Sequence, residues 1–434
     1  MLELCKFSVT LHRIKLYTKL FPSLIRAIIV FCRIDILYYN NFYIHVIMSE
    51  KMSLPHWLSL ISLTFATFIF NTSEFVPIGL LTDIQTEFHL TKASVGMLIS
   101  VYAWVVMLLS LPLMIMVSKM EMRRLMLWLL GLFTAFQVMS FLSDSFGMLM
   151  LSRIGVACTH SIFWSIISPI AVRIVPEKHR SLALSMVVTG SSVAMILGMP
   201  LGRIIGLHVG WRMTFLSIGI FSAFTFCYTA LKLPIVPSRG GFSVRKLPAL
   251  LNQKGIIGTY IFTLLVSTAY YIGYSYIEPF LKQVAHMSDS LVTATLMIFG
   301  GAGFLGSLAF SRYYSRNRKA FIAWVVGLMV VCLLLLTPTS FSTSLLIVVC
   351  AVWGMAATAY NVAMQSNIIL ITTPESTSVA MSIFSGIFNL GIGSGAFFGG
   401  QICDYADISY IGYAGAILGF IALIYWIKRL GTRV

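Results

Sequence analysis

Residues 70–81 read FNTSEFVPIGLL and place a carboxylate inside a helix-length run of apolar residues. The run begins near Leu54 and reads LPHWLSLISLTFATFIF before Glu74 is reached. Its length suits the hydrocarbon core of a bilayer, which is roughly 30 Å thick. An acid within such a segment is costly, so Glu74 is a candidate functional residue.

Composition indicates that this segment is one of many. Of the 434 residues, 58% are hydrophobic and only 10% are charged, whereas soluble domains average about 25% charged residues. The chain is therefore predicted to be an all-α, polytopic membrane protein embedded in a lipid bilayer. The net charge of +16 does not indicate a nucleic-acid partner, because the Lys and Arg residues form short clusters between apolar runs, as positive-inside topology requires.

The order of the apolar runs predicts about twelve transmembrane helices, the first over 54–81 and the seventh over 256–280. One long polar break divides them into two six-helix bundles, residues 48–233 and 256–434, joined by a cytoplasmic loop over 234–255. Residues 1–47 differ, with six Lys or Arg among apolar patches too short to span. We expect this extension to be non-native, with Met48 as the start; the alternative is a genuine basic cytoplasmic tail.

The loops differ in charge on the two sides of the predicted bundle. Basic residues such as Lys119, Arg123 and Arg124 follow the even-numbered runs and the central break, whereas the opposite loops carry Asp and Glu. Both termini are therefore expected in the cytoplasm. The two halves also resemble each other weakly, with Glu74 near the outer end of helix 1 and Glu278 near that of helix 7, as repeated helix bundles would produce.

Several local signatures carry a resemblance to a known family. They are FIFNTSEFVPIGLL at 68–81, VYAWVVMLLSLP at 101–112, SRIGVA at 152–157, GMPLGRIIG at 198–206, GWRMTF at 210–215, YSYIEPF at 274–280, FGGAGFLGS at 299–307 and FSGIFNLGIGSGA at 384–396. With twelve spans in two halves, the chain resembles the major facilitator superfamily over residues 52–430. Within it, the chain is most similar to bacterial proton-driven sugar efflux transporters of the drug-antiporter-like branch.

That resemblance implies a monomeric transporter of the bacterial inner membrane that exports a sugar or sugar-like solute in exchange for protons by alternating access. Efflux of drugs or other small metabolites by the same mechanism is the alternative. One departure concerns the loop after helix 2, where Met114 and Ser118 stand in place of the family's glycine and aspartate. The gate formed there by Lys119 and the two arginines that follow is expected to be weaker, or to use Glu121.

Glu74 is the first candidate for proton coupling, with Arg153 as its expected counterpart. Burial favours the protonated carboxyl group and a nearby cation favours the ionised one, so an acid balanced between them can load and release a proton. Arg153 is expected at a similar depth on helix 4, where the resemblance also implies an arginine near the proton path. The alternatives are a structural ion pair for Glu74 and a snorkelling interfacial side chain for Arg153.

Candidate substrate-binding residues accompany these charges. Arg153, His160 and Trp164 share one helical stripe, and Asn71 lies one turn before Glu74. Hydroxyls of a sugar need hydrogen bonds, and its apolar ring face can pack on an aromatic side chain. Simple packing and a histidine satisfied by its neighbours are the alternatives.

The second half offers Glu278, either a second protonatable site or a solvated residue at the mouth. Tyr271 and Tyr274 are expected on the same helical face as Glu278. Asn361 and Gln365, one turn apart on helix 10, are further candidate partners for substrate hydroxyls.

Helix 5 carries a stripe of small residues that includes Gly190, Gly198, Pro200 and Gly202. Such stripes let helices approach closely in lipid, and Pro beside Gly permits a bend. The resemblance identifies GMPLG as the helix 5 signature of antiporters; tight packing without a transport role is the alternative. No Walker motif, CxxC pair or catalytic cluster is present, so neither an enzyme, a metal site nor a cofactor is expected.

Overall fold

The computed structural model describes residues 52–117, 119–237, 253, 255–373 and 377–430, and within these the side chains of residues 181, 378 and 430 are left aside. The extension over 1–47 and most of the central loop therefore lie outside the described residues. The described part is helical throughout, without strands. Twelve of its helices are long and apolar enough to cross a membrane. The prediction of an all-α membrane protein with about twelve spans is confirmed.

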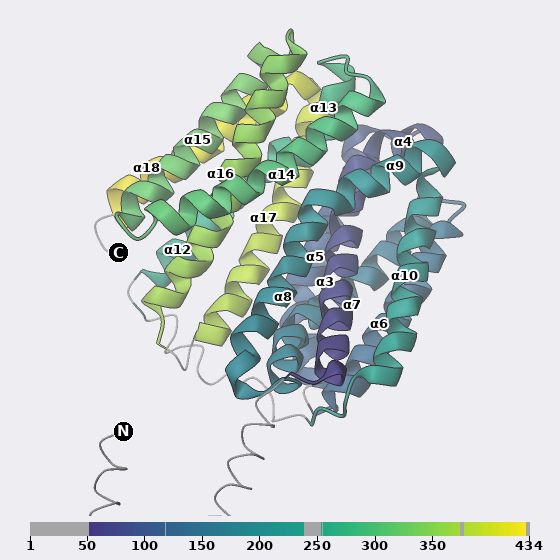
Figure 1. Cartoon of the computed structure of the whole chain (residues 1–434). Coiled ribbons are helices and arrows are strands. Elements are labelled where there is room, and N and C mark those ends of the chain that lie inside the picture. The colour runs from purple at the N-terminus through teal and green to yellow at the C-terminus, as the bar shows by residue number, and fades with distance from the viewer. Residues whose placement is uncertain (1–51, 118, 238–252, 254, 374–376, 431–434) are drawn as a thin grey trace, which may run out of the picture.

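The helices before the central loop pack mainly with one another, and we call them the first bundle (Figure 1). They are α3 (Leu54–Gly79), α4 (Leu81–Glu87), α5 (Lys92–Val117), α6 (Met122–Phe141), α7 (Phe146–Arg173), the 3-10 turn Glu177–His179, α8 (Arg180–Val193), the π-helical turn η2 (Ala194–Gly198), α9 (Met199–Val209) and α10 (Trp211–Lys232).

The helices after the loop form the second bundle, drawn in green to yellow in Figure 1. They are α12 (Ile256–Tyr274), α13 (Ile277–Gln283), α14 (Asp289–Tyr313), α15 (Arg318–Thr339), α16 (Thr343–Ile371), α17 (Thr377–Tyr405), the 3-10 turn Ile408–Tyr410, α18 (Ile411–Tyr425) and the π-helical turn Trp426–Leu430.

The first and seventh spans are broken near one end, whereas the sequence predicted each as continuous. Helix α3 ends at Gly79 and α4 begins two residues later; α12 ends at Tyr274 and α13 begins at Ile277. Pro77 removes one backbone donor just before the first break, and Pro279 lies in the first turn of α13, where a missing N–H is tolerated. The short helices α4 and α13 contact each other across the two bundles.

The two bundles pack most closely at the end of the molecule where these breaks lie. We call it the acidic end, because Glu87, Asp144, Asp289 and Asp404 lie there, and we call the opposite end, with the central loop, the basic end. A Cβ atom on Gly400 of α17 would lie 2.8 Å from Ala93 Cα of α5, whereas one on Gly386, nearer the basic end, would meet only Met107 Cγ at 3.9 Å. Contacts of α14 with η2 and α9 add to this closure.

At the basic end, Glu121 connects segments of the first bundle. Its carboxylate accepts hydrogen bonds from the backbone N–H groups of Arg123 (2.7 Å), Arg124 (2.8 Å) and Val236 (2.8 Å), so it caps α6 and holds the chain that follows α10. Arg123 donates to Ala230 O at 2.6 Å. These contacts tie the loop after α5 to its own bundle.

We expect Glu121→Gln to lower the stability of the purified protein by about 1 kcal/mol near neutral pH, the usual worth of a helix cap. Burial raises the pKa of Glu121, but the three backbone donors and the charge of Arg123 outweigh burial and hold the pKa below its ordinary value. The stabilisation is therefore present above the unfolded-state pKa of about 4.3 and is lost as pH falls through the folded-state pKa.

Thermal melting at neutral and acidic pH checks this expectation. The difference between the wild type and Glu121→Gln should shrink at the lower pH. Glu177→Gln is the matched control, because Glu177 is 82% exposed in an ion pair with Arg180 and such pairs contribute little. Equal melting of the two variants at neutral pH would contradict the capping role.

Candidate functional site

Pro77 organises the polar interior of the first bundle. Proline has no N–H, so the Ser73 carbonyl four residues earlier loses its helical partner. Arg153 of α7 supplies a donor instead: its Nη2 lies 2.8 Å from Ser73 O, and its Nη1 lies 3.1 Å from Ser73 Oγ. Gln137 of α6 donates to the same hydroxyl at 2.5 Å. Three helices thus meet at one serine.

Arg153 is fully buried among aromatic rings. Its guanidinium carbon lies 4.7 Å from the ring centre of Tyr102 and 5.6 Å from that of Phe215. Stacking on aromatic faces suits the planar guanidinium better than an ammonium group. The side chain is therefore a fixed internal cation rather than a snorkelling interfacial one.

Glu74 lies next to this cluster, and its side chain is only 10% exposed. Arg153, its expected counterpart, does not pair with it directly, because the guanidinium is engaged with Ser73; Arg153 acts on Glu74 at longer range. Within the described part of the chain, His160 is the one base within 4.0 Å of the Glu74 carboxylate, with 3.6 Å between Nε2 and Oε2. That distance is too long for a hydrogen bond.

His160 is held on both ring nitrogens. Trp164 Nε1 donates to His160 Nε2, and the Tyr102 hydroxyl lies 2.7 Å from His160 Nδ1. An indole N–H is a donor only, so Nε2 must accept and the neutral ring carries its proton on Nδ1. Of the expected stripe on α7, Trp164 and His160 are hydrogen-bonded to each other, and Arg153 is connected to them through Tyr102 of α5.

The remaining candidate substrate-binding residues lie in α3, α12 and α16. Asn71 is buried on α3, and Tyr271, near the end of α12, lies within electrostatic range of Glu74. Gln365 donates to Asn361 at 2.5 Å on α16, so this pair satisfies itself in part. Tyr271 and Tyr274 pack in an aromatic group with Tyr270, Phe299 and Trp353.

Glu278 is neither solvated nor on the same helix as these tyrosines. It lies beyond the break, in α13, and is 0% exposed. Its Oε1 accepts from Arg203 Nη1 of α9 at 2.8 Å, so its charge is compensated by an arginine of the other bundle. The alternative of a solvated residue is therefore wrong. The expected shared face with Tyr271 and Tyr274 is also wrong, because the helix is interrupted at Ser275 and Tyr276.

The small residues of the fifth span pack directly on α3. A Cβ atom on Gly190 would lie 2.4 Å from Thr64 O, one on Gly198 2.5 Å from Thr72 Oγ1, and one on Gly202 2.6 Å from Val76 Cγ2. The π-helical turn η2 precedes Pro200, so the helix is irregular where a bend was expected. This contact holds the helix of Glu74 in place.

Four residues with central polar contacts were not expected from the sequence: Ser73, Tyr102, Gln137 and Arg203. Pro77 lies four residues after Ser73 and could have indicated that the Ser73 carbonyl needs another donor. Arg203 could have been noticed as an arginine inside the apolar run GMPLGRIIG. Tyr102 and Gln137 lie on other helices, and only the packing brings them to the site. Among the described residues, no group of three or more His, Cys, Asp or Glu side chains could hold a metal ion.

The chain is similar to known membrane transporters in sequence and in structure. The family model described as Major Facilitator Superfamily matches residues 63–368 and 317–433. Similar solved structures include a bacterial homolog of the human lysosomal transporter Spinster in an inward-facing, unoccupied conformation (TM-score 0.72, 16% identity, 88% of this chain and 98% of that chain). A mutant of the nucleoside transporter NupG gives a TM-score of 0.71 at 16% identity, covering 85% of this chain and 98% of that chain.

The human organic anion transporter MFSD10 is also similar, with a TM-score of 0.61 and 14% identity over 86% of this chain and 100% of that chain. At these identities the structural likeness establishes the fold.

Proposed function

Since this chain belongs to the Major Facilitator Superfamily, we propose that it is a proton-coupled secondary transporter that exports sugars or sugar-like solutes by alternating access. The acidic end faces the outside and the basic end faces the cytoplasm of a bacterial inner membrane, with both termini inside, because positively charged loops are retained on the cytoplasmic side. The close packing at the acidic end then corresponds to an inward-facing arrangement.

The observation that carries proton coupling is the state of Glu74. Its carboxyl group is buried, its nearest base is a neutral His160 whose Nε2 already accepts a hydrogen bond, and the guanidinium of Arg153 is occupied by Ser73. An ionised carboxylate in that setting is only partly compensated, which favours proton uptake. The fixed charge of Arg153 opposes permanent protonation, so Glu74 can exchange a proton during each cycle.

Glu278 is assigned no proton step in this proposal. The guanidinium of Arg203 binds the Glu278 carboxylate directly, whereas the guanidinium of Arg153 is engaged with Ser73. A single carrier, Glu74, with Arg153 as its long-range cation, accounts for the coupling.

Sugar recognition is supported by polar and aromatic groups in both bundles. Asn71, His160 and Trp164 lie in the first bundle, and Tyr271, Tyr274, Asn361 and Gln365 lie in the second. Hydroxyl, amide and imidazole groups can meet the hydroxyls of a sugar, and the indole or phenol rings can pack on its apolar face. Because the two sets belong to different bundles, a solute between them would contact both.

Efflux of drugs is the second candidate, and a specific observation favours it. Trp164 of α7, Tyr270 of α12 and Phe388 of α17 are aromatic side chains that are only partly buried. Flat apolar compounds could stack on such rings. The proton mechanism at Glu74 would be the same.

Transport in inverted membrane vesicles separates the two substrates. With an imposed proton gradient, vesicles containing this protein should accumulate at least one labelled sugar from a broad panel, and a protonophore should abolish the accumulation. Vesicles from cells lacking the protein are the control. Accumulation of a drug without accumulation of any sugar would contradict the sugar assignment and favour the second candidate.

A further inference from the structure

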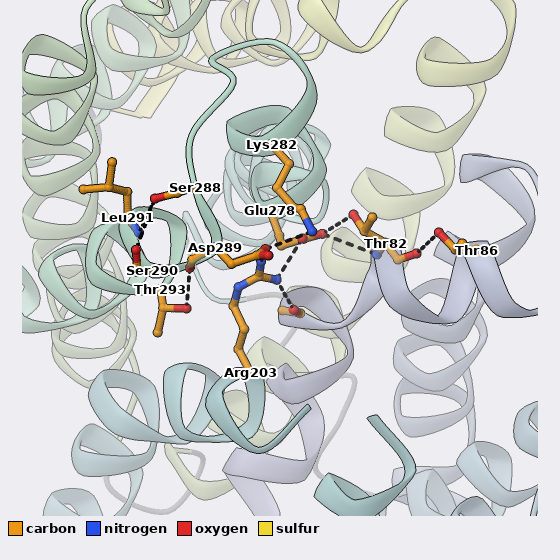
Figure 2. Close-up of polar contacts among 11 residues, drawn as sticks. Thr82, Thr86, Arg203, Glu278, Lys282, Ser288, Asp289, Ser290, Leu291 and Thr293 are labelled. Atoms are coloured by element: carbon orange, nitrogen blue, oxygen red, sulfur yellow. Dashed lines mark hydrogen bonds and ion pairs between the residues drawn. The ribbon is translucent and has the colours of Figure 1, made fainter. Parts of the chain in front are cut away.

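A cluster of charged side chains at the acidic end joins the two bundles and has no part in the proton or substrate steps described above. Arg203 of α9 lies at its centre (Figure 2), and its side chain is completely buried. Its Nη1 donates to Gly79 O at 2.7 Å and to Glu278 Oε1 at 2.8 Å, and its Nη2 donates to Asp289 Oδ1 at 2.8 Å. One guanidinium thus caps the end of α3 and binds two acids of the opposite bundle.

Glu278 is held by the first bundle on both carboxylate oxygens. Besides the bond from Arg203 to Oε1, the Thr82 hydroxyl of α4 donates to Oε2 at 2.6 Å, and the Thr82 N–H lies 3.4 Å from the same oxygen. Figure 2 shows Thr82 and Arg203 approaching Glu278 from different elements. The carboxylate is 0% exposed, so its contacts across the bundles replace water.

Asp289 is a weaker partner at the rim of the cluster. Its side chain is 48% exposed, and it also receives Lys282 Nζ of its own bundle at 2.9 Å. Water can therefore replace Arg203 as a partner of Asp289. Glu278 is buried, so water cannot replace Arg203 there while the bundles are packed together. The pair that depends most on the approach of the bundles is Arg203 with Glu278.

We infer that the Arg203–Glu278 pair is a latch that holds the mouth at the acidic end shut and must open once in every transport cycle. Helices α9 and α13 belong to opposite bundles, so a passage at this end requires the pair to separate. Farther toward the middle of the spans the two bundles also touch: a Cβ atom on Gly300 of α14 would lie 2.8 Å from Ile196 Cα of η2. Opening would admit water to both charges.

The free energy of the Arg203–Glu278 pair is compatible with its repeated separation. Attraction between buried charges is largely offset by the loss of their hydration, so a complete pair holds two surfaces together without making their separation prohibitive. Removing one partner has a different effect, because the remaining buried charge favours the state in which water reaches it. Loss of either latch residue should therefore shift the conformational equilibrium toward opening at the acidic end.

Spin labels at Val209→Cys and Phe341→Cys, in a cysteine-free background that still folds, report on this mouth. The two positions are 61% and 83% exposed, lie at the acidic end of opposite bundles and take no part in the cluster. Pulsed electron paramagnetic resonance in lipid should give mainly short distances for this background. Glu278→Gln and Arg203→Gln should increase a longer-distance population on the order of tenfold.

Three further variants make the test specific. Asp289→Asn should have a smaller effect, and Arg203→Lys should retain more of the closed population than Arg203→Gln. Glu87→Gln removes an ion pair with Arg212 at the same end but within the first bundle, so it should leave the distances unchanged. Unchanged distances in folded Glu278→Gln and Arg203→Gln, or an equal shift in Glu87→Gln, would overturn the latch.

The inference rests on alternating access within the proposed function but on neither the sugar nor the proton assignment, because the distances are measured without substrate or gradient. A normal latch with no proton coupling would refute only the role of Glu74. Normal coupling with no shift in distances would refute only the latch.

Discussion

Arg153→Ala is expected to lower the stability of the protein by about 3 kcal/mol or more and to abolish most transport. The substitution leaves the Ser73 carbonyl without the donor that replaces the missing Pro77 N–H, and an unsatisfied buried acceptor costs about 1–3 kcal/mol. It also empties space beside Tyr102 and Phe215, which adds a cavity cost. Glu74 would then lack the fixed cation that acts on it and would tend to remain protonated.

Thermal melting in detergent and transport in proteoliposomes measure the two parts of this prediction. Arg318→Ala is the matched control, because Arg318 is exposed at the first turn of α15. Arg153→Lys should recover some stability through its charge, but it cannot reproduce the forked donation to Ser73 O and Oγ. If Arg153→Ala melts and transports like Arg318→Ala, the buried arginine has neither role.

Glu74→Gln is expected to abolish accumulation of substrate against a gradient while leaving passive exchange of substrate largely intact. Glutamine keeps the size of the side chain and its capacity for hydrogen bonds, but it cannot bind and release a proton. Coupling should fall by orders of magnitude, whereas stability should change little or rise, because the cost of a buried carboxylate is removed.

Counterflow and gradient-driven uptake in the same proteoliposomes separate these outcomes. Glu87→Gln is the control acid-to-amide change, since Glu87 lies outside the membrane spans. Burial raises the pKa of Glu87, but its hydrogen bonds from Arg212 and Trp211 outweigh burial, so the pKa is lower than its ordinary value. Loss of counterflow together with uptake in Glu74→Gln would indicate a structural rather than a coupling role.

The sequence predicted the parts of this account that depend on a single helix. An acid in an apolar run marked Glu74, spacings of seven and four placed Arg153, His160 and Trp164 on one stripe, and the small residues of the fifth span indicated close packing. Each follows from helical periodicity and from the cost of polar groups in lipid.

The partners across helices could not be predicted in the same way. Arg153 was expected near Glu74 as its counterpart, but its guanidinium binds the carbonyl freed by Pro77 instead. Glu278 was read as a residue of one long helix, but the break after Tyr274 turns it toward Arg203, 75 residues away in the chain. No local spacing encodes such contacts, because they arise only when two bundles dock.

Proton movement during downhill sugar flow shows whether Glu74 carries the coupled proton. Proteoliposomes with a pH-sensitive dye inside are given a sugar gradient and no imposed proton gradient. In the wild type, sugar efflux should drive protons in the opposite direction, and in Glu74→Gln sugar should flow without any proton flux. Sugar flow in Glu74→Gln that still moves protons as it does in the wild type would contradict the assignment of Glu74 as the carrier.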